Sequence, residues 1–299
     1  MKLSIRHRTR YGYATAASQS LNQICLTPRD TPQQRCLQSS IAIDPEPNLI
    51  EYRPDQYGNS IATFNLSVQH THCDIIVTSL VETVEAQRNL PNGLGVNDNQ
   101  QVIRAEHRRD GLMAHDCLLP SPLIALDDTV NAIIEELPVG DMPVLAYAER
   151  LMQHIFTTFQ YESGFSTLVT PLTDIITARK GVCQDFAHLA IAVCRKQGIP
   201  ARYVSGYLET LPPPGEKKLQ GADASHAWFA VYSADNGWYD FDPTNNKRPD
   251  IKYITTAWGR DYDDVVPIKG VVYGGGTHTL TVEVDVNRTE LSPSLVYQE

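Results

Sequence analysis

The chain has 299 residues, which is enough for two ordinary domains or one large one. Apolar residues make up 42% of it and charged residues 20%, as is usual for a globular protein. The formal net charge is -10 and the isoelectric point is near 5.4, which argues against a nucleic-acid-binding surface, because such a surface needs clustered Lys and Arg.

Residues 1–85 are predicted to form β-strands. The strand period is clearest at the start, where polar residues alternate with Leu3, Ile5, His7, Thr9, Tyr11 and Tyr13. Further short alternating runs cover 24–26, 41–43, 61–66 and 75–84, and turn-forming residues separate them. Several short strands at this spacing predict a small antiparallel β-sandwich, which we assign to residues 1–90.

An α+β domain is predicted after an irregular segment. Residues 91–124 contain two Pro-rich stretches and are predicted to be a linker. Residues 125–299 are assigned to the second domain, in which helices come first and antiparallel strands follow. Its helical patterns cover 128–137 and 143–159, and its strand patterns cover 201–208, 226–232, 238–242 and 280–286.

The most informative stretch is Gly181-Val182-Cys183-Gln184-Asp185-Phe186-Ala187-His188-Leu189. Apolar residues continue from it at helical spacing, and Gly198-Ile199-Pro200 ends the pattern. Cys183 is therefore expected in the first turn of a buried helix, near unsatisfied N–H groups and the positive end of the helix dipole. This setting favours the thiolate, which is the nucleophilic form of cysteine.

A cysteine nucleophile needs a base, and His226 is the best candidate. It lies in Asp223-Ala224-Ser225-His226-Ala227-Trp228, at the start of a predicted strand that follows a loop. Functional side chains often lie where such a rigid element meets an accessible cleft. Histidine can take the thiol proton near neutral pH and return it to a leaving amine.

The base in turn needs an orienting carboxylate, and Asp240 and Asp242 both qualify by type. A hairpin that is symmetric about Ala234 places Asp242 opposite His226, close enough for a hydrogen bond. Placing Asp240 there would push Asn236-Gly237, a favoured turn pair, into the strand. We therefore favour Asp242 over Asp240.

These motifs resemble the transglutaminase-like superfamily. The order and spacing of the Cys183 stretch, of Ser225-His226-Ala227-Trp228 and of Asp242-Pro243-Thr244-Asn245 match the Cys–His–Asp triad of that family. The resemblance is closer to bacterial two-domain members, which carry a β-sandwich ahead of a papain-like core. It covers almost the whole chain, through Arg8-Thr9-Arg10-Tyr11-Gly12-Tyr13, Leu26-Thr27-Pro28-Arg29 and Tyr57-Gly58-Asn59 in the first domain and Gly274-Gly275-Gly276 in the tail of the core.

The resemblance implies a triad of Cys183, His226 and Asp242 and an acyl-enzyme on Cys183. It implies a protein or peptide substrate that offers a glutamine carboxamide or a peptide amide, with an amine or water as the acceptor. Members are variously transglutaminases, proteases and deamidases, so thiol-dependent acyl transfer and peptide-bond hydrolysis by a cysteine protease both stay open. A non-catalytic binding protein that retained the fold is the alternative from another class.

The oxyanion donors are predicted less completely. The backbone N–H of Cys183 is expected to point at the oxyanion of an acyl-transfer intermediate. Animal transglutaminases also use a tryptophan upstream of the nucleophile, whereas every Trp of this chain follows Cys183. Tyr161, a nearby upstream hydroxyl donor, is the substitute that we consider. Nothing resembles the calcium loops of the animal enzymes, so no metal and no other cofactor is expected.

Several other side chains that could carry chemistry are expected to be structural. Cys194 and His188 lie on the predicted helix and are assigned to the core. Asp185 favours the start of this helix or orients the substrate. Three neighbouring residues could bind a metal, namely His70, His72 and Cys73. They lack a second pair of ligands at zinc-site spacing, so they are expected to be ordinary strand residues.

The predicted compartment is the cytoplasm. The first residues show no continuous apolar core, so no signal peptide is expected. No segment approaches the roughly 20 apolar residues that span a bilayer, so no membrane partner is expected. The six scattered cysteines are expected to be reduced, as in a cytosolic enzyme. The loop around Pro212–Gly221 gives no sign of whether it gates a cleft.

Overall fold

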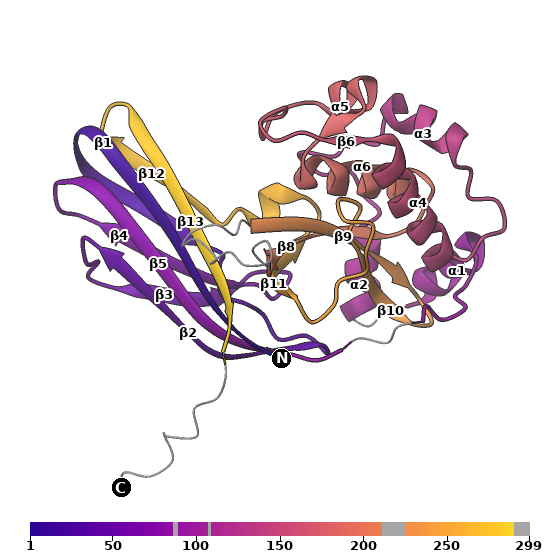
Figure 1. Ribbon diagram of the computed structural model, residues 1–299, viewed down its shortest axis with the longest axis horizontal. Helices are drawn as coiled ribbons and strands as arrows, with labels where there is room; N and C mark the ends of the chain where they lie inside the picture. Colours follow the sequence, from indigo (N-terminus) through magenta and orange to yellow (C-terminus); the bar gives the residue numbers. More distant parts are fainter. Residues whose placement is uncertain (86–88, 107–108, 211–224, 290–299) are drawn as a thin grey trace, which may run out of the picture.

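Two lobes, an antiparallel sheet and an α+β core, lie side by side in the computed structural model (Figure 1). The structure describes residues 1–85, 89–106, 109–210 and 225–289. The predicted fold class, an N-terminal β domain followed by an α+β core, is confirmed. The loop around Pro212–Gly221 lies outside the described residues. Among the helices that the structure describes, none is long and apolar enough to cross a bilayer.

Strand β1 (Lys2–Ile24) organises the N-terminal lobe because it pairs with four other strands. Its residues 3–12 pair with β5 (His70–Thr83) and with β13 (His278–Arg288). Its residues 20–24 pair with β4 (Ser60–Leu66) and with β12 (Ile268–Gly274). The remaining strands are β2 (Gln34–Asp44), which pairs with β5, and β3 (Ile50–Pro54), which pairs with β4.

The two halves of this sheet enclose one shared core. Leu3 and Ile5 from the first half belong to the same buried cluster as Ile24 and Phe64 from the second. Hydrogen bonds nevertheless join all seven strands into one sheet, which β1 crosses with an irregularity between residues 12 and 17. The expected sandwich is therefore a single antiparallel sheet that curls around its core.

The last two strands belong to the N-terminal sheet. The assignment of residues 125–299 to the core is corrected here, because β12 and β13 pair with β1. The alternation of Val284 and Val286 with polar residues predicts a strand with one buried face, and both side chains are buried. Such a pattern does not say which sheet the strand joins, so the return of the chain to the first lobe was missed.

The core packs helices against a four-stranded antiparallel sheet with the order β10-β9-β8-β11. Helix α6 (Cys183–Lys196) lies at its centre and is buried along nearly its whole length. The strands are β8 (Ala201–Leu208), β9 (Ser225–Ser233), β10 (Gly237–Phe241) and β11 (Tyr253–Gly259). The other elements are η1 (Asp128–Val130), α3 (Asn131–Glu136), α4 (Val144–Thr158), β6 (Gln160–Tyr161), α5 (Leu172–Ala178), β7 (Lys180–Gly181) and η2 (Tyr262–Val265).

The predicted linker contains two helices, α1 (Val96–Ala105) and α2 (Arg109–Asp116). The buried side chain of Asn99 in α1 accepts a hydrogen bond of 2.7 Å from the backbone N–H of Ala234, in the turn between β9 and β10. The segment therefore supports this hairpin. The sequence did not reveal it because α1 is mostly polar and Ile103 is its one buried apolar residue.

Side-chain amides of the first lobe cover the free edge of β11. Gln34 exchanges two hydrogen bonds of 2.8 Å with the backbone N–H and C=O of Thr255. Asn59 does the same with Trp258, at 3.0 Å and 2.8 Å. An edge strand presents unpaired N–H and C=O groups, so these two amides take the place of a missing strand and fix the lobes against each other.

Candidate active site

Cys183 is the first residue of α6, as the sequence predicts. The carboxylate of Asp185 accepts a hydrogen bond of 2.8 Å from the backbone N–H of Val182 and another from the hydroxyl of Ser166. Asp185 therefore caps the helix that carries the thiol. A Cβ on Gly181 would lie 2.9 Å from that of Asp185, so only glycine lets the chain enter the helix this closely.

His226 lies near the start of β9 and is joined to both other predicted members of the triad. Its Nε2 lies 2.7 Å from Oδ2 of Asp242, and Cys183 is close enough to help raise the pKa of His226. The side chain of His226 is largely buried and that of Asp242 is fully buried. The structure therefore brings Cys183, His226 and Asp242 together.

The carboxylate of Asp242 is held by several donors. Asn245 Nδ2 donates to Oδ2 over 2.7 Å, and the hydroxyl of Tyr253 donates to the same oxygen over 2.8 Å. Oδ1 accepts from the backbone N–H of Thr244 over 2.9 Å. Burial raises the pKa of Asp242, but these bonds and the charge of His226 outweigh it and keep the pKa below its usual value. Asp242 is therefore ionised at neutral pH.

The imidazole of His226 has a strongly raised pKa. Burial alone lowers the pKa of His226, but the hydrogen bonds to Asp242 and Cys183 and the charges of both raise the pKa to about 10. A histidine with such a pKa is an imidazolium at neutral pH. Such an imidazolium can act as a proton donor beside the thiol.

The hairpin register differs from the predicted one, which is corrected here. Ser233 pairs with Gly237 and Phe229 with Phe241, so the hairpin is centred on Asp235 and not on Ala234. A β-turn from Ser233 to Asn236 with a 3.0 Å hydrogen bond precedes Gly237, which has a φ of 86°. This is the three-residue loop that ends in a left-handed glycine.

In this register, His226 and Asp242 are diagonal neighbours on one face of the hairpin. The pairing continues so that Asp242 falls level with Trp228, two residues after His226. Side chains at diagonal positions can still touch when they are long enough. The carboxylate that the sequence favoured therefore meets the histidine, although not from the directly opposite position.

Asp240 lies farther along the same hairpin, where it pairs with Ala230. Its nearest positive charge is on Arg202, whose guanidinium stacks on Trp238 at 4.1 Å and on Trp258 at 3.8 Å. Burial raises the pKa of Asp240, and the charge of Arg202 opposes this. Asp240 thus lies on the same face of the hairpin as His226 but farther from it, beside Arg202.

Two tyrosines lie near the thiol. Tyr161 pairs with Gly181 across β6 and β7, and its ring is about half exposed. Burial raises the pKa of Tyr161, and the charge of Cys183 adds to the effect. Tyr203 from β8 is buried, and its pKa is raised by burial and then by Cys183. Sequence reasoning did not identify Tyr203.

Asn245 and Tyr253 are further parts of the site that the sequence analysis did not assign. Asn245 falls within the Asp242-Pro243-Thr244-Asn245 motif, so its position after the aspartate was a usable signal. Tyr253 gave none, because it reaches Asp242 only through the pairing of β11 with β8.

The other residues with chemical side chains have structural surroundings. His188 accepts a hydrogen bond of 3.2 Å from the backbone N–H of Tyr262, and burial lowers the pKa of His188 to about 4. His70 bonds the carbonyl of Val68, and Cys73 is buried. Within the described ranges no three His, Cys, Asp or Glu side chains group as a metal site would require.

Comparisons with known proteins agree with the two-lobe organisation. Residues 3–82 match the bacterial transglutaminase-like N-terminal region, and residues 131–243 match the transglutaminase-like superfamily. The second range contains Cys183, His226 and Asp242.

Three relatives place these matches in context. An uncharacterised protein of Mycobacterium tuberculosis (strain H37Rv) is 35% identical over 94% of this chain and 91% of its own length. A protein-glutamine gamma-glutamyltransferase of Pseudomonas aeruginosa is 31% identical over 35% of this chain and 17% of its own. The solved structure of a candidate cysteine protease from Cytophaga hutchinsonii has a TM-score of 0.73 and 24% identity, over 99% of this chain and 94% of its own; this likeness concerns the fold.

Proposed function

Because this chain belongs to the transglutaminase-like superfamily and carries the bacterial transglutaminase-like N-terminal region, we propose that it is a cysteine acyltransferase acting on glutamine carboxamides of a protein or peptide. The family consists of thiol-dependent enzymes. One observation carries the proposal: beside Cys183 lies a largely buried imidazole that is fixed by a fully buried carboxylate.

In the first half of the proposed reaction, the thiolate of Cys183 attacks the carbonyl carbon of the carboxamide, and a C–S bond forms. The carbonyl electrons move to the oxygen, which becomes the oxyanion. When the oxyanion collapses, the C–N bond breaks and His226 gives its proton to the leaving ammonia. The product is a thioester on Cys183 and a neutral imidazole.

In the second half, His226 accepts a proton from the attacking primary amine as the amine adds to the thioester. Collapse of this second oxyanion breaks the C–S bond, and the thiolate leaves beside the imidazolium. Asp242 holds the imidazole through Nε2 in both halves, so it selects the tautomer and stabilises the cationic form.

Two groups are proposed to bind the oxyanion. The N–H of Cys183 is one of the first N–H groups of α6, which have no acceptor within a helix. Tyr161 is the proposed second donor, because its hydroxyl is close enough to Cys183 for its pKa to respond to that charge after burial. Losing one such donor typically lowers the rate about a hundredfold or more.

Mass spectrometry of Cys183 after incubation with glutamine peptides tests the proposal, with and without a primary amine. We expect a thioester adduct on Cys183 and, when amine is present, a peptide whose glutamine carries it. A Cys183→Ser variant should form neither. Cleaved peptide with a new N-terminus would instead identify a cysteine protease, and an unmodified Cys183 with unmodified peptides would indicate a binding protein.

A further inference from the structure

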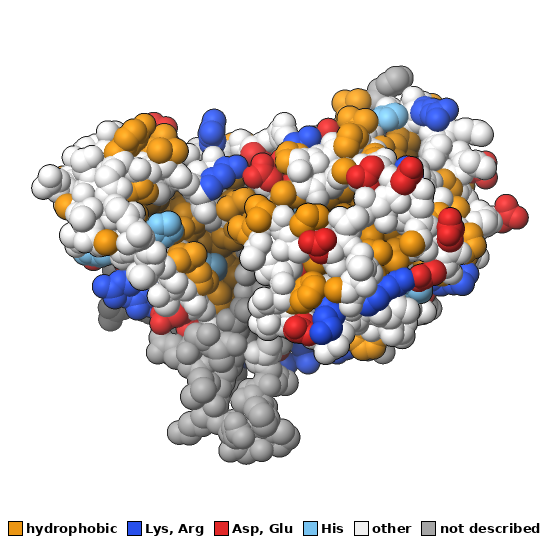
Figure 2. All heavy atoms as spheres, turned by 90° about the horizontal axis from the view of Figure 1, so that it is seen from above, with side chains coloured by type: hydrophobic (Ala, Val, Ile, Leu, Met, Phe, Trp, Pro, Cys, Tyr) orange, Lys and Arg blue, Asp and Glu red, His pale blue; other side chains and the backbone are white. Residues whose placement is uncertain are grey.

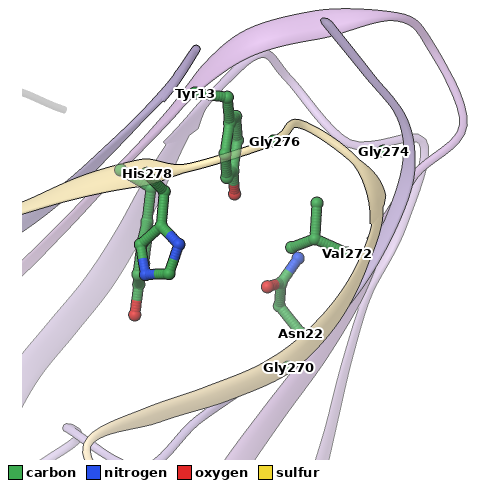
Figure 3. Close-up of a pocket in the computed structure, with 8 residues that line it drawn as sticks. Tyr13, Asn22, Gly270, Val272, Gly274, Gly276 and His278 are labelled. Atoms are coloured by element: carbon green, nitrogen blue, oxygen red, sulfur yellow. The ribbon is translucent and has the colours of Figure 1, made fainter. Parts of the chain in front are cut away.

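A pocket of about 330 Å³ lies in the N-terminal lobe, where β1 passes from one half of the sheet to the other. Figure 3 shows Tyr13 and His278 on one side of it and Asn22 and Val272 on the other, all directed into the same space. The volume is at the lower end of the range for ligand pockets. The lining residues also include Tyr11, Gly270, Gly274 and Gly276.

Glycines keep this pocket open. A Cβ on Gly270 would lie 2.5 Å from the side-chain oxygen of Asn22, and one on Gly275 would lie 3.2 Å from the ring of Tyr13. Gly274, Gly275 and Gly276 have φ angles of 86°, 80° and 64°, which other residues rarely adopt. The turn between β12 and β13 can therefore approach β1 closely without side chains that would fill the space.

The described lining carries aromatic rings and no Asp, Glu, Lys or Arg side chain. Burial, followed by the charges of Cys73 and Tyr11, raises the pKa of Tyr13 to about 12, so its hydroxyl stays neutral. Tyrosine hydroxyls and an amide can donate and accept hydrogen bonds, while the rings offer apolar faces. This chemistry fits an uncharged polar group attached to an apolar or aromatic one, as in a polypeptide segment.

Tyrosines of both lobes lie in the region between the pocket and the core. The pKa of Tyr11 is raised by burial and then by the charges of Cys73 and Tyr262, so Tyr11 and Tyr262 are near each other. The ring of Tyr262 lies 6.1 Å from that of Tyr203, and Tyr203 is near Cys183. Figure 2 shows a hollow between the two lobes in which hydrophobic side chains gather.

Strand β13 adds an exposed apolar stripe that ends at the pocket. Val284, Val282 and Leu280 are on the face that carries His278, because they alternate along the strand. Val284 is 1% exposed, but Val282 is 49% and Leu280 55% exposed. The stripe therefore leaves the buried core of the sheet and becomes accessible as it approaches His278.

We propose that the pocket and this stripe bind the polypeptide segment that flanks the reacting carboxamide in the protein substrate. The proposal rests on the proposed function and extends it to substrate selection. The segment is extended and uncharged: its apolar side chains contact Leu280 and Val282, and an aromatic or amide side chain enters the pocket between Tyr13 and His278.

Two substitutions at adjacent positions of β12 test this binding site. Val272→Phe fills the pocket, whereas Val271→Phe adds the same ring to the exposed opposite face of the strand. The donors are a blocked single glutamine and a pool of long glutamine peptides with uncharged flanking residues. We expect Val272→Phe to raise KM for the peptide pool about tenfold, as for the loss of one apolar contact. The kcat for the pool and the kinetic constants for the blocked glutamine should not change.

The proposal would be overturned if Val272→Phe and Val271→Phe changed KM for the pool equally, or if Val272→Phe changed KM equally for both donors. If the wild type converts neither donor, the proposed function fails, and calorimetric binding of the pool to the Cys183→Ser protein then decides about the pocket. Binding should be lost with Val272→Phe and kept with Val271→Phe; the same affinity in both disproves the site. If Val272→Phe does not fold, His278→Ala, at an exposed position, replaces it.

Discussion

Nε2 of His226 and Oδ2 of Asp242 lie 2.7 Å apart although the two residues are not opposite each other in the β9–β10 hairpin. The contact forms because both side chains are on one face and Asp242 begins the turn after β10. Asn245 and Tyr253 then hold the carboxylate in place. The contact between His226 and Asp242 thus depends on residues beyond the hairpin.

Replacing Asp242 with Asn should lower kcat strongly. The amide keeps the volume but removes the charge that stabilises the imidazolium, and the corresponding change in a serine protease triad costs about four orders of magnitude. The measurement is amine incorporation into a glutamine peptide. Asp240→Asn is the matched control on the same strand and should keep most of the activity. Loss of activity in Asp240→Asn but not in Asp242→Asn would show that the orienting carboxylate is misassigned.

Activity should fall as the pH rises through about 10. The pKa of His226 is raised to about 10 against burial by its bonds to Asp242 and Cys183, and the imidazolium must protonate the leaving ammonia. In the Asp242→Asn protein this basic limb should move to lower pH, because one cause of the raised pKa is gone. Profiles of kcat/KM against pH for both proteins check this; identical basic limbs would contradict it.

Stability should follow the same protonation. The pKa of His226 is about 10 in the folded protein and 6.5 as its ordinary value, so the stabilisation is complete below about 6.5 and is lost as the pH rises through about 10. Urea unfolding at several pH values should therefore give a free energy of unfolding that declines over this range. The decline should be smaller in His226→Ala, and an equal decline would assign it to other groups.

Iodoacetamide at pH 6 should modify Cys183 faster than Cys36. All six cysteines are in the described part of the chain, and these two are the ones that are not fully buried. Burial and the charge of Asp30 raise the pKa of Cys36, whereas an imidazolium faces Cys183. We expect a rate ratio of at least about ten, since an ordinary thiol is almost entirely protonated at this pH. His226→Ala should remove the difference, and a ratio near one in the wild type would contradict an activated thiol.

Gly206→Ala should destabilise the core and disturb the site. Gly206 pairs with His226, and a Cβ there would lie 2.0 Å from the carbonyl oxygen of Ile254 and 2.7 Å from the indole of Trp228. Such overpacking costs about 1–3 kcal/mol or more in the free energy of unfolding. Urea denaturation measures it. Gly95→Ala is the control, because nothing lies within 4 Å of its Cβ, and its loss as a helix cap should cost less than about 1 kcal/mol. Similar losses at both positions would contradict the packing argument.

The sequence alone determined the features that depend on neighbouring residues. The helical spacing after Gly181 placed Cys183 in the first turn of α6, and the predicted strand at 201–208 coincides with β8. These features follow from local periodicity and from turn residues. Cys183, His226 and Asp242 were singled out because their motifs are short and because few residue types suit a nucleophile, a base or an orienting group.

Tertiary structure decided the hairpin register, the membership of β12 and β13 and the donors around Asp242. Asn99, from a segment predicted to be a linker, bonds the turn at Ala234, and Tyr253 reaches Asp242 from another strand. Contacts between residues far apart in the chain leave no period in the sequence, because each depends on where a whole element packs. The sequence could therefore single out Cys183, His226 and Asp242 as candidates, while packing determined how they meet.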